Sequence, residues 1–385
     1  MKGATLELYN PFLPKSVDDF KIRRFEKEST TSSSPLRSIA REAITQYTCT
    51  TYSTRGMRLL ESWHMANFQL LQRYVALKIL KADESNNNKE LEILLKLSAS
   101  GLDHPGKCHV IELLDHFELN GSNGTHLCLV FPAMLSDGEA MGASRRPRQA
   151  AYVRAISKQL LLGLDFIHEL GIIHCDLQPA NIMFSVVGTV DDKPRLQPPE
   201  FSPVRWLEGM KIDESAPEYL MVTQRHEGEL DNADLTKIMV KIGDLGGAVQ
   251  SQKHDQRPVT PTALRAPELI HRNVWDSAID IWTLGCLIFQ LATNEPLFPL
   301  GTFGLTAEQI DKEHIYQMSQ LLDENGQMGE TFTKHLTDRL PSDFGAENIQ
   351  HLALFLSLML QQNPEMRMPA AGLLNHVFLV GEPES

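Results

Sequence analysis

The sequence contains no run of about 18 apolar residues, the length that a membrane-spanning helix requires. Its N-terminal region also lacks the apolar stretch of a signal peptide. Cysteine is scarce, because the five cysteines among 385 residues are widely spread and show no spacing typical of metal ligands. These absences argue against a membrane partner and against a disulfide-stabilised secreted domain. We expect an intracellular protein, located in the cytoplasm, the nucleus or both.

Glycine is almost missing from the first hundred residues, where only Gly3 and Gly56 occur. A loop whose backbone must approach a phosphate closely needs glycine, so this part of the chain lacks the residues for a glycine-rich phosphate-binding loop. A Ser/Thr run at residues 30–35 is typical of a flexible segment, and residues 59–71 are compatible with either a helix or a damaged pair of strands. We interpret residues 1–73 as an atypical, partly flexible N-terminal segment.

Positive charge is in short supply and unevenly distributed. The whole chain has a net charge of −13, and because residues 1–73 carry +4, the remainder carries −17. Such an acidic body disfavours direct binding of nucleic acid and favours basic protein partners. The alternative is that the acidity only improves solubility.

A polar stretch from Ile173 to Asn181 has the pattern of a catalytic loop. Asp176 precedes Asn181 by five positions, a spacing that lets the carboxylate face a substrate hydroxyl while the amide holds a metal on nucleotide phosphates. Pro179 stiffens the turn between them. Apolar residues recur at helical period before the loop, at Val153, Ile156, Leu160, Leu164 and Ile167, and predict a long helix that leads into it. The alternative is an accidental loop.

A lysine in an apolar strand is the second feature that predicts chemistry. Residues 74–80 alternate like a strand and include Lys78, which would be buried only with a partner. Glu90 begins an amphipathic helix that extends to residue 97, and an ion pair with Lys78 would aim the ammonium group at phosphates. Glu92 is the second choice of partner. The alternative is a solvated lysine on an edge strand.

Later segments extend this organisation. Residues 127–131 are typical of a buried strand and lead to a hinge at residues 132–134, while residues 238–242 predict a strand that ends at Asp244. The helix predicted at residues 278–291 is apolar nearly all round and should be buried. Asp280 near its start would then need partners, which the backbone of the catalytic loop could supply.

Residues 74–380 resemble a eukaryotic protein kinase of the SR-protein kinase-like group. The resemblance rests on seven features in the expected order: Val75-Ala76-Leu77-Lys78, Glu90, the loop from His174 to Asn181, Asp244-Leu245-Gly246, Ala266-Pro267-Glu268, the helix from Asp280 to Gly285, and Arg367. The resemblance implies that Arg367 pairs with Glu268, and we expect that pair to be buried.

The resemblance implies an α+β, two-lobed fold with a small β-rich lobe and a larger, mostly helical lobe. The small lobe with its hinge would occupy residues 74–134 and would be incomplete. The large lobe would occupy residues 135–380 and carry an inserted loop at about residues 186–237, followed by a tail at 381–385. The insert occurs where SR-protein kinases also carry one. The alternative is a disordered surface loop.

The resemblance further implies a serine/threonine protein kinase that uses ATP and Mg²⁺. The catalytic residues would be Asp176, Asn181 and Gln178, and the metal ligands would be Asn181 and Asp244. The nucleotide-binding residues would be Lys78, Glu90, Ala76, Phe131, Ala133 and Met134. The substrates would be proteins, basic or Arg/Ser-rich ones, and we expect a monomer.

Two departures from the family pattern bear on activity: no G-x-G-x-x-G motif precedes Lys78, and Gln178 replaces a lysine. Cys175 replaces an arginine that binds phosphorylated activation segments in many kinases, but SR-protein kinases also lack that arginine, so this substitution fits the resemblance. Loss of that lysine's charge could cost on the order of 100-fold in rate. The alternatives are therefore a pseudokinase, or a small-molecule phosphotransferase, although Ala266-Pro267-Glu268 and Arg367 disfavour the latter.

Overall fold

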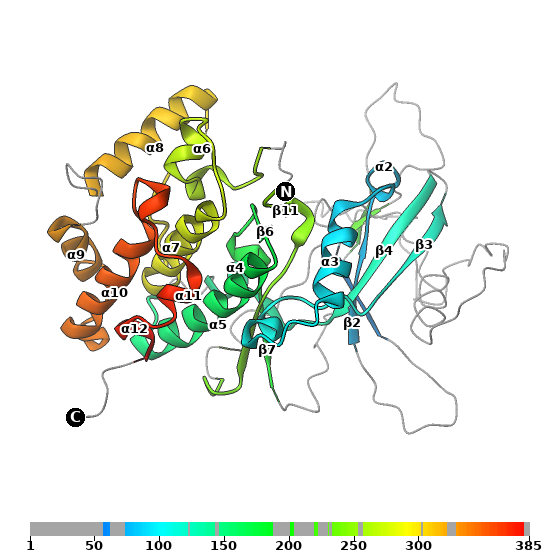
Figure 1. Cartoon of the computed structure of the whole chain (residues 1–385), viewed down its shortest axis with the longest axis horizontal. Coiled ribbons are helices and arrows are strands. Elements are labelled where there is room, and N and C mark those ends of the chain that lie inside the picture. Colours follow the sequence, from blue (N-terminus) through cyan, green and yellow to red (C-terminus); the bar gives the residue numbers. More distant parts are fainter. Residues whose placement is uncertain are drawn as a thin grey trace, which may run out of the picture.

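The structure, a computed structural model, describes residues 57–61, 74–121, 124–142, 146–187, 201–203, 219–221, 230, 233–252, 257–301, 303–321 and 329–380. Of the expected N-terminal segment at residues 1–73, the structure describes only residues 57–61, and most of the expected insert also lies outside these ranges. Figure 1 shows a strand-rich part with helix α3 at one end of the molecule and a larger helical part at the other. The two-lobed α+β fold expected from the sequence is therefore confirmed.

The small part is built on one antiparallel sheet with the strand order β1-β2-β4-β3. Its strands are β1 (Met57–Glu61), β2 (Tyr74–Ile79), β3 (Asp115–Gly121) and β4 (Gly124–Pro132). β2 and β4 lie at the centre, which explains why their residues are apolar and largely buried. β1 pairs with β2 along its whole length, so the sheet includes residues before the expected boundary at residue 74.

Helix α3 (Lys89–Ala99) covers the face of the small sheet that is directed toward the helical part. The side chain of Asn88 accepts a hydrogen bond from the backbone N–H of Leu91, which caps the first turn. The apolar stripe predicted for this helix faces the core, with Leu94 and Leu97 buried and Leu91 half-buried, and Ile93 is buried beside it. The short helix α2 (Ala82–Ser85) precedes α3, and the 3₁₀ turn η2 (Pro105–His109) follows it.

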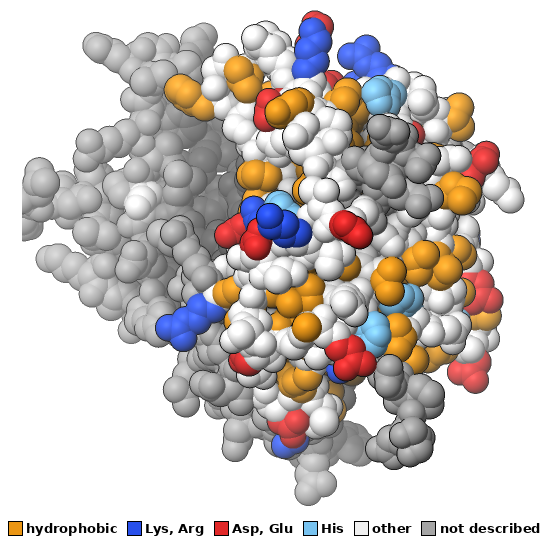
Figure 2. All heavy atoms as spheres, turned by 90° about the vertical axis from the view of Figure 1, so that its left-hand side faces the viewer, with side chains coloured by type: hydrophobic (Ala, Val, Ile, Leu, Met, Phe, Trp, Pro, Cys, Tyr) orange, Lys and Arg blue, Asp and Glu red, His pale blue; other side chains and the backbone are white. Residues whose placement is uncertain are grey.

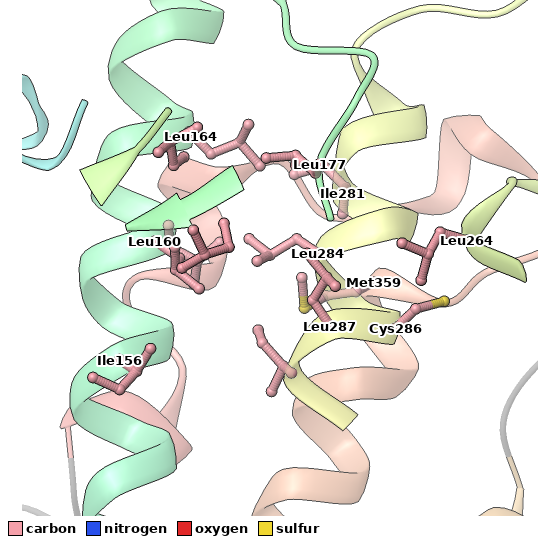
Figure 3. Packing of buried hydrophobic residues seen from close by; sticks show 14 of the residues in the cluster. Ile156, Leu160, Leu164, Leu177, Leu264, Ile281, Leu284, Cys286, Leu287 and Met359 are labelled. Atoms are coloured by element: carbon pink, nitrogen blue, oxygen red, sulfur yellow. The ribbon is translucent and has the colours of Figure 1, made fainter. Parts of the chain in front are cut away.

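The large part is organised around α5 (Ala150–Glu169) and α7 (Ala278–Thr293). Figure 3 shows Ile156, Leu160 and Leu164 of α5 directed toward Leu284 and Leu287 of α7. Because α7 is apolar around most of its circumference, it lies in the interior. The other helices are α4 (Gly138–Gly142), α6 (Pro267–Ile270), α8 (Ala307–Leu321), α9 (Glu330–Thr337), α10 (Ala346–Met359), α11 (Ala370–Leu373) and α12 (Val377–Val380), with 3₁₀ turns η6 (Ser342–Phe344) and η7 (Pro364–Met366).

Short strands carry the loops that matter for function. β5 (Ser136–Asp137), β7 (Ile182–Val186) and β10 (Ile238–Ile242) form one small sheet, and β6 (Ile172–Ile173) pairs with β11 (Val249–Gln250). The 3₁₀ turns η3 (Pro179–Asn181), η4 (Leu245–Gly247) and η5 (Thr262–Leu264) lie in the connecting loops. The ladder between β7 and β10 brings the two ends of the insert together, and the insert itself contains the hairpin β8 (Phe201–Pro203) and β9 (Tyr219–Met221).

The surface at the helical end is chemically mixed. Figure 2 shows the apolar side chains of the described residues in several small groups among acidic and basic ones on this face. Within the described ranges, no helix is both long enough and apolar enough to span a bilayer.

Candidate active site

Lys78 belongs to the face of the small sheet that points toward the large part. Because side chains alternate along a strand, Val75 and Leu77 lie on the opposite face, where they join the smaller apolar cluster. Ala76 lies on the same face as Lys78 and joins the large core. The strand register therefore directs the only cation of β2 into the junction between the two parts of the molecule.

The ammonium group of Lys78 joins two carboxylates. Its Nζ lies 2.8 Å from each carboxylate oxygen of Glu90 and 2.7 Å from Oδ1 of Asp244. The predicted ion pair with Glu90 is therefore confirmed, whereas Glu92, the second choice, contacts Gln250. Residues from β2, α3 and the segment after β10 thus meet at one point.

These contacts shift the pKa values in opposite directions. Burial alone would lower the pKa of Lys78, but the carboxylates of Glu90 and Asp244 outweigh it, so the pKa is raised. Burial would raise the pKa of Asp244, but the ammonium of Lys78 holds it below its usual range. Lys78 stays a cation and Asp244 an anion at neutral pH, as phosphate and metal binding require.

Asp280 holds the start of the catalytic loop, as expected from the sequence. Its carboxylate accepts hydrogen bonds from the backbone N–H groups of His174, at 2.7 Å, and Cys175, at 3.0 Å. The ring of His168 lies 2.9 Å from the same carboxylate. Cys175 has a φ of +63°, a left-handed conformation that is unusual for a residue with a side chain. The buried carboxylate of α7 therefore stabilises a strained turn directly before Asp176.

Two further contacts fix this loop. The Nδ1 atom of His174 accepts a hydrogen bond from the backbone N–H of Asp176, so the ring proton lies on Nε2. This Nε2–H donates a hydrogen bond to the backbone carbonyl of Gly243, at 3.0 Å. Figure 3 shows Leu177 directed into the core between Leu164 and Ile281. The loop is thereby attached both to the segment that carries Asp244 and to the core.

Asp176 is held by two neutral amides. Nε2 of Gln178 donates to Oδ1 of Asp176 at 2.9 Å, and Nδ2 of Asn181 donates to Oδ2 at 3.1 Å and to the backbone carbonyl at 2.8 Å. The structure therefore brings together all three residues predicted to be catalytic. Burial raises the pKa of Asp176, with partial opposition from the hydrogen bonds that Gln178 and Asn181 donate, which makes the carboxylate a better proton acceptor.

The backbone at Asp244 and the glycine at position 246 leave space beside the charged groups. Asp244 has a left-handed φ of +54° and accepts a hydrogen bond from the N–H of Gly246. A Cβ atom on Gly246 would lie 3.2 Å from the carboxylate of Asp244 and 3.7 Å from Nζ of Lys78. A side chain at this position would therefore occupy space beside the charged groups.

The residues expected to contact the nucleotide base come from two paired strands and from the segment after β4. Ala76 of β2 lies opposite Phe131 of β4, and both are buried. Ala133 and Met134 follow β4 and are half-buried, and Met134 packs against the large core. The side chains of Ala76 and Phe131 thus lie on the same face of the sheet as Lys78.

The donor set fits a magnesium ion bound together with nucleotide. Among the described residues, no group of three or more His, Cys, Asp or Glu side chains could hold a metal by itself. Mg²⁺ in nucleotide sites commonly takes only one or two protein carboxylates, with phosphate and water completing the shell. Asp244, a third exposed, offers a carboxylate, and Asn181 uses its amide nitrogen toward Asp176, which leaves its amide oxygen for a cation.

The predicted pair of Glu268 and Arg367 is buried and bidentate. Nη1 of Arg367 lies 2.6 Å from one carboxylate oxygen of Glu268, and Nη2 lies 2.7 Å from the other. The guanidinium also lies over the ring of Trp282, 5.1 Å from the ring centre. This pair attaches the end of the segment after Asp244 to the core of the large part.

Sequence reasoning missed two residues beside Asp176. A Cβ atom on Gly247 would lie 3.1 Å from Cβ of Asp176 and 2.6 Å from Val259, so this position excludes a side chain. Thr260 is buried and donates its hydroxyl proton to the carbonyl of Cys175, at 2.8 Å. The doubled glycine after Leu245 is a signal for the first residue, whereas nothing local identifies the second.

The chain is similar to known proteins over most of its length. Residues 67–193 and 218–379 match the protein kinase domain family, and the gap between these ranges falls within the expected insert. The serine/threonine-protein kinase SRPK of Physarum polycephalum is 30% identical over 350 residues, which cover 81% of this chain and 80% of that protein. Protein kinase dsk1 of Schizosaccharomyces pombe is 27% identical over 417 residues, which cover 80% and 76%. The matched ranges include every site residue described above.

Proposed function

We propose that the site around Lys78, Asp176 and Asp244 transfers the γ-phosphate of ATP to serine or threonine in basic, Arg/Ser-rich proteins. The proposal starts from the fact that this chain belongs to the protein kinase family and is a serine/threonine protein kinase. Protein kinases in general use ATP and Mg²⁺. The observation that carries the proposal is the contact of Lys78 with both Glu90 and Asp244, beside a loop that holds Asp176.

Each residue has a role that follows from its contacts. When bound, ATP supplies the phosphoryl group and Mg²⁺ neutralises the charge that develops during transfer. Asp176, oriented by the amides of Gln178 and Asn181, accepts the proton of the substrate hydroxyl. Lys78 would hold the α- and β-phosphates of the nucleotide, and Ala76, Phe131, Ala133 and Met134 would contact its base. Asn181 and Asp244 would hold the metal.

The substrate class is inferred from charge. The chain outside residues 1–73 is strongly acidic, and positively charged Arg/Ser-rich segments would be attracted to it. Similarity to a kinase named SRPK supports the same class. The four described cysteines are free, three of them buried, which suits a reducing compartment, and we place the protein inside the cell as a monomer.

The test is phosphate transfer from Mg²⁺-ATP to an Arg-Ser-repeat peptide, with a Glu-Ser-repeat peptide as the charge-reversed control. We expect transfer to the first peptide alone, and we expect its KM to rise with salt. Asp176→Ala should lose nearly all transfer while binding nucleotide normally, and Asp244→Ala should weaken Mg²⁺-ATP binding itself. Equal activity of the Asp176→Ala variant would refute the proposal, and nucleotide binding without transfer by the wild type would favour a pseudokinase.

A further inference from the structure

Helix α3 carries Glu90, so its position decides whether Lys78 has its partner. Ile93, Leu94 and Leu97 attach α3 to the core, but apolar packing is non-directional and tolerates small rotations or sliding of a helix. The distance of 2.8 Å between Lys78 and Glu90 requires a defined position. Polar contacts between α3 and the large part can supply that position.

Two side chains of α3 make such contacts, and neither is part of the site described above. Glu92 and Lys96 are four residues apart, so they lie on the same side of the helix. Oε1 of Glu92 accepts a hydrogen bond from the side chain of Gln250 in β11, at 3.3 Å. Nζ of Lys96 donates to the backbone carbonyl of Leu170, at 2.8 Å. Both partners belong to the large part.

The carbonyl that Lys96 contacts is a favourable one for a cation. Leu170 is the C-cap residue of α5, where helix carbonyls lack partners within the helix. The end of a long helix also carries partial negative charge, which attracts an ammonium group. Lys96 itself lies in the last turn of α3 and is half-buried, so its contact is partly protected from water.

Leu170 lies directly before the segment that leads to the catalytic carboxylate. Gly171 follows it and accepts a hydrogen bond from Ser251 at 2.9 Å, and β6 then pairs with β11 before the chain reaches Asp176. Glu92 therefore contacts strand β11 itself, whereas Lys96 contacts the residue two positions before its partner strand β6. The sheet of these two strands connects the catalytic loop to the segment that follows Asp244.

We propose that Lys96 is a positioning residue for phosphate transfer: by bonding to the end of α5, it fixes α3 so that Glu90 stays in contact with Lys78. The proposal rests on the proposed function, because it concerns the same nucleotide site. It also gives α3 an attachment that needs no phosphate on the activation segment. Glu92 and Gln250 support the same attachment from the adjacent turn.

The test compares Lys96→Met, which keeps the length of the side chain but removes its charge, with the wild type. We expect the KM for ATP to rise and kcat/KM for ATP to fall about 10-fold, the factor typical of losing a hydrogen bond to a charged group. The KM for the peptide and the melting temperature should change little. Lys96→Arg should restore most of the activity, and Lys89→Met, an exposed lysine of the same helix, should match the wild type.

A double variant tests whether Lys96 acts through Glu90. In the Glu90→Gln background the partner of Lys78 is already weakened, so adding Lys96→Met should have a much smaller effect than it has alone. Backbone hydrogen exchange provides a readout without catalysis, because α3 should exchange faster in Lys96→Met than in the wild type or in Lys89→Met.

Three results would overturn the proposal: unchanged kinetics for Lys96→Met, an equal loss for Lys89→Met, or an undiminished effect in the Glu90→Gln background. A wild type that transfers no phosphate would refute the proposed function instead. In that case the exchange of α3 decides alone, and equal exchange in Lys96→Met and wild type would refute the attachment.

Discussion

At the scale of single residues, the carboxylate of Asp176 is contacted by two neutral amides where the family pattern has a lysine beside it. Both side-chain oxygens of Asp176 accept hydrogen bonds from amides, one from Gln178 and one from Asn181. An amide orients a carboxylate as well as a lysine does, but it brings no positive charge to a transferring phosphate. Gln178 therefore contributes to orientation, whereas in the proposed mechanism the positive charge would come from Lys78 and from the metal.

The first prediction concerns this position. Gln178→Lys should raise kcat about 10-fold, because a positive charge would face the negative charge that develops during transfer, and KM for ATP should change less. The measurement is steady-state phosphorylation of the Arg-Ser-repeat peptide. Gln178→Met, which keeps the size but removes the donor, is the control and should be slower than the wild type. If Gln178→Lys is no faster, the missing charge does not limit the reaction.

At the scale of secondary-structure elements, buried ion pairs hold the loops of the site against the helices. Glu268 of α6 and Arg367 after η7 are each at most 5% exposed, and the guanidinium also donates to the backbone carbonyls of Gln361 and Ala278. The pair has its remaining hydrogen-bond needs met, as a buried pair requires. It connects the end of the segment after Asp244 to α7.

The second prediction follows from that burial. Arg367→Ala should destabilise the protein by about 3–5 kcal/mol, because it leaves the carboxylate of Glu268 buried without its partner. The matched control is Arg339→Ala, which breaks an exposed pair with Glu295 and should cost at most about 1 kcal/mol. Chemical denaturation measures both. Similar values for the two variants would show that burial does not distinguish these pairs.

The third prediction concerns His314 in the middle of α8. Its ring is fully buried against the edge of Phe298, and neither nitrogen has a hydrogen-bond partner among the described residues. Burial, with a smaller contribution from Arg265, lowers the pKa of His314 to about 4, against roughly 6.5 in an unfolded chain. The unfolded state therefore binds the extra proton first, and the stabilisation is lost as the pH falls from about 6.5 toward 4.

The measurement is the free energy of unfolding as a function of pH. His314→Leu should flatten the decline between about pH 6.5 and 4, because the group that charges on unfolding is gone. The exposed His271 provides the control, since His271→Leu should leave the slope unchanged. Parallel pH curves for the wild type and His314→Leu would contradict the burial of this ring.

At the scale of the whole molecule, the two parts contribute unequal shares of the nucleotide site. The large part supplies Asn181 and Asp244, and the small part supplies Lys78 with Glu90 and the wall formed by Ala76. The connection from β1 to β2, residues 62–73, contains no glycine in its sequence. A backbone cover over phosphates ordinarily needs glycine there.

The fourth prediction is that nucleotide binding is weak and that glycine improves it. A chimera in which a G-x-G-x-x-G strand pair replaces residues 50–73 should bind Mg²⁺-ATP more tightly than the unmodified chain, because backbone N–H groups could then reach the phosphates. Calorimetric titration of both proteins measures the difference. Micromolar binding by the unmodified chain that does not improve in the chimera would show that another segment covers the phosphates.

The sequence by itself determined the main helices and strands and which of their residues need partners. A lysine in a buried strand requires a partner, an aspartate in an apolar helix requires donors, and a stripe of apolar residues requires a core. These demands predicted the Lys78–Glu90 pair, the role of Asp280 and the burial of α7, and all three predictions are confirmed. Each of these predictions was possible because the need for a partner or for burial follows from the residue type and its near neighbours in the sequence.

Only the tertiary structure decided those contacts in which one partner is a backbone group far away in the sequence. The carbonyl that Lys96 meets at Leu170 exists at every residue, so nothing in the sequence marks it. The same holds for the hydroxyl of Thr260 on the carbonyl of Cys175 and for the pairing of β1 with β2. Backbone groups are identical along a chain, and which one a side chain reaches depends on how the elements pack, a long-range outcome that local patterns do not encode.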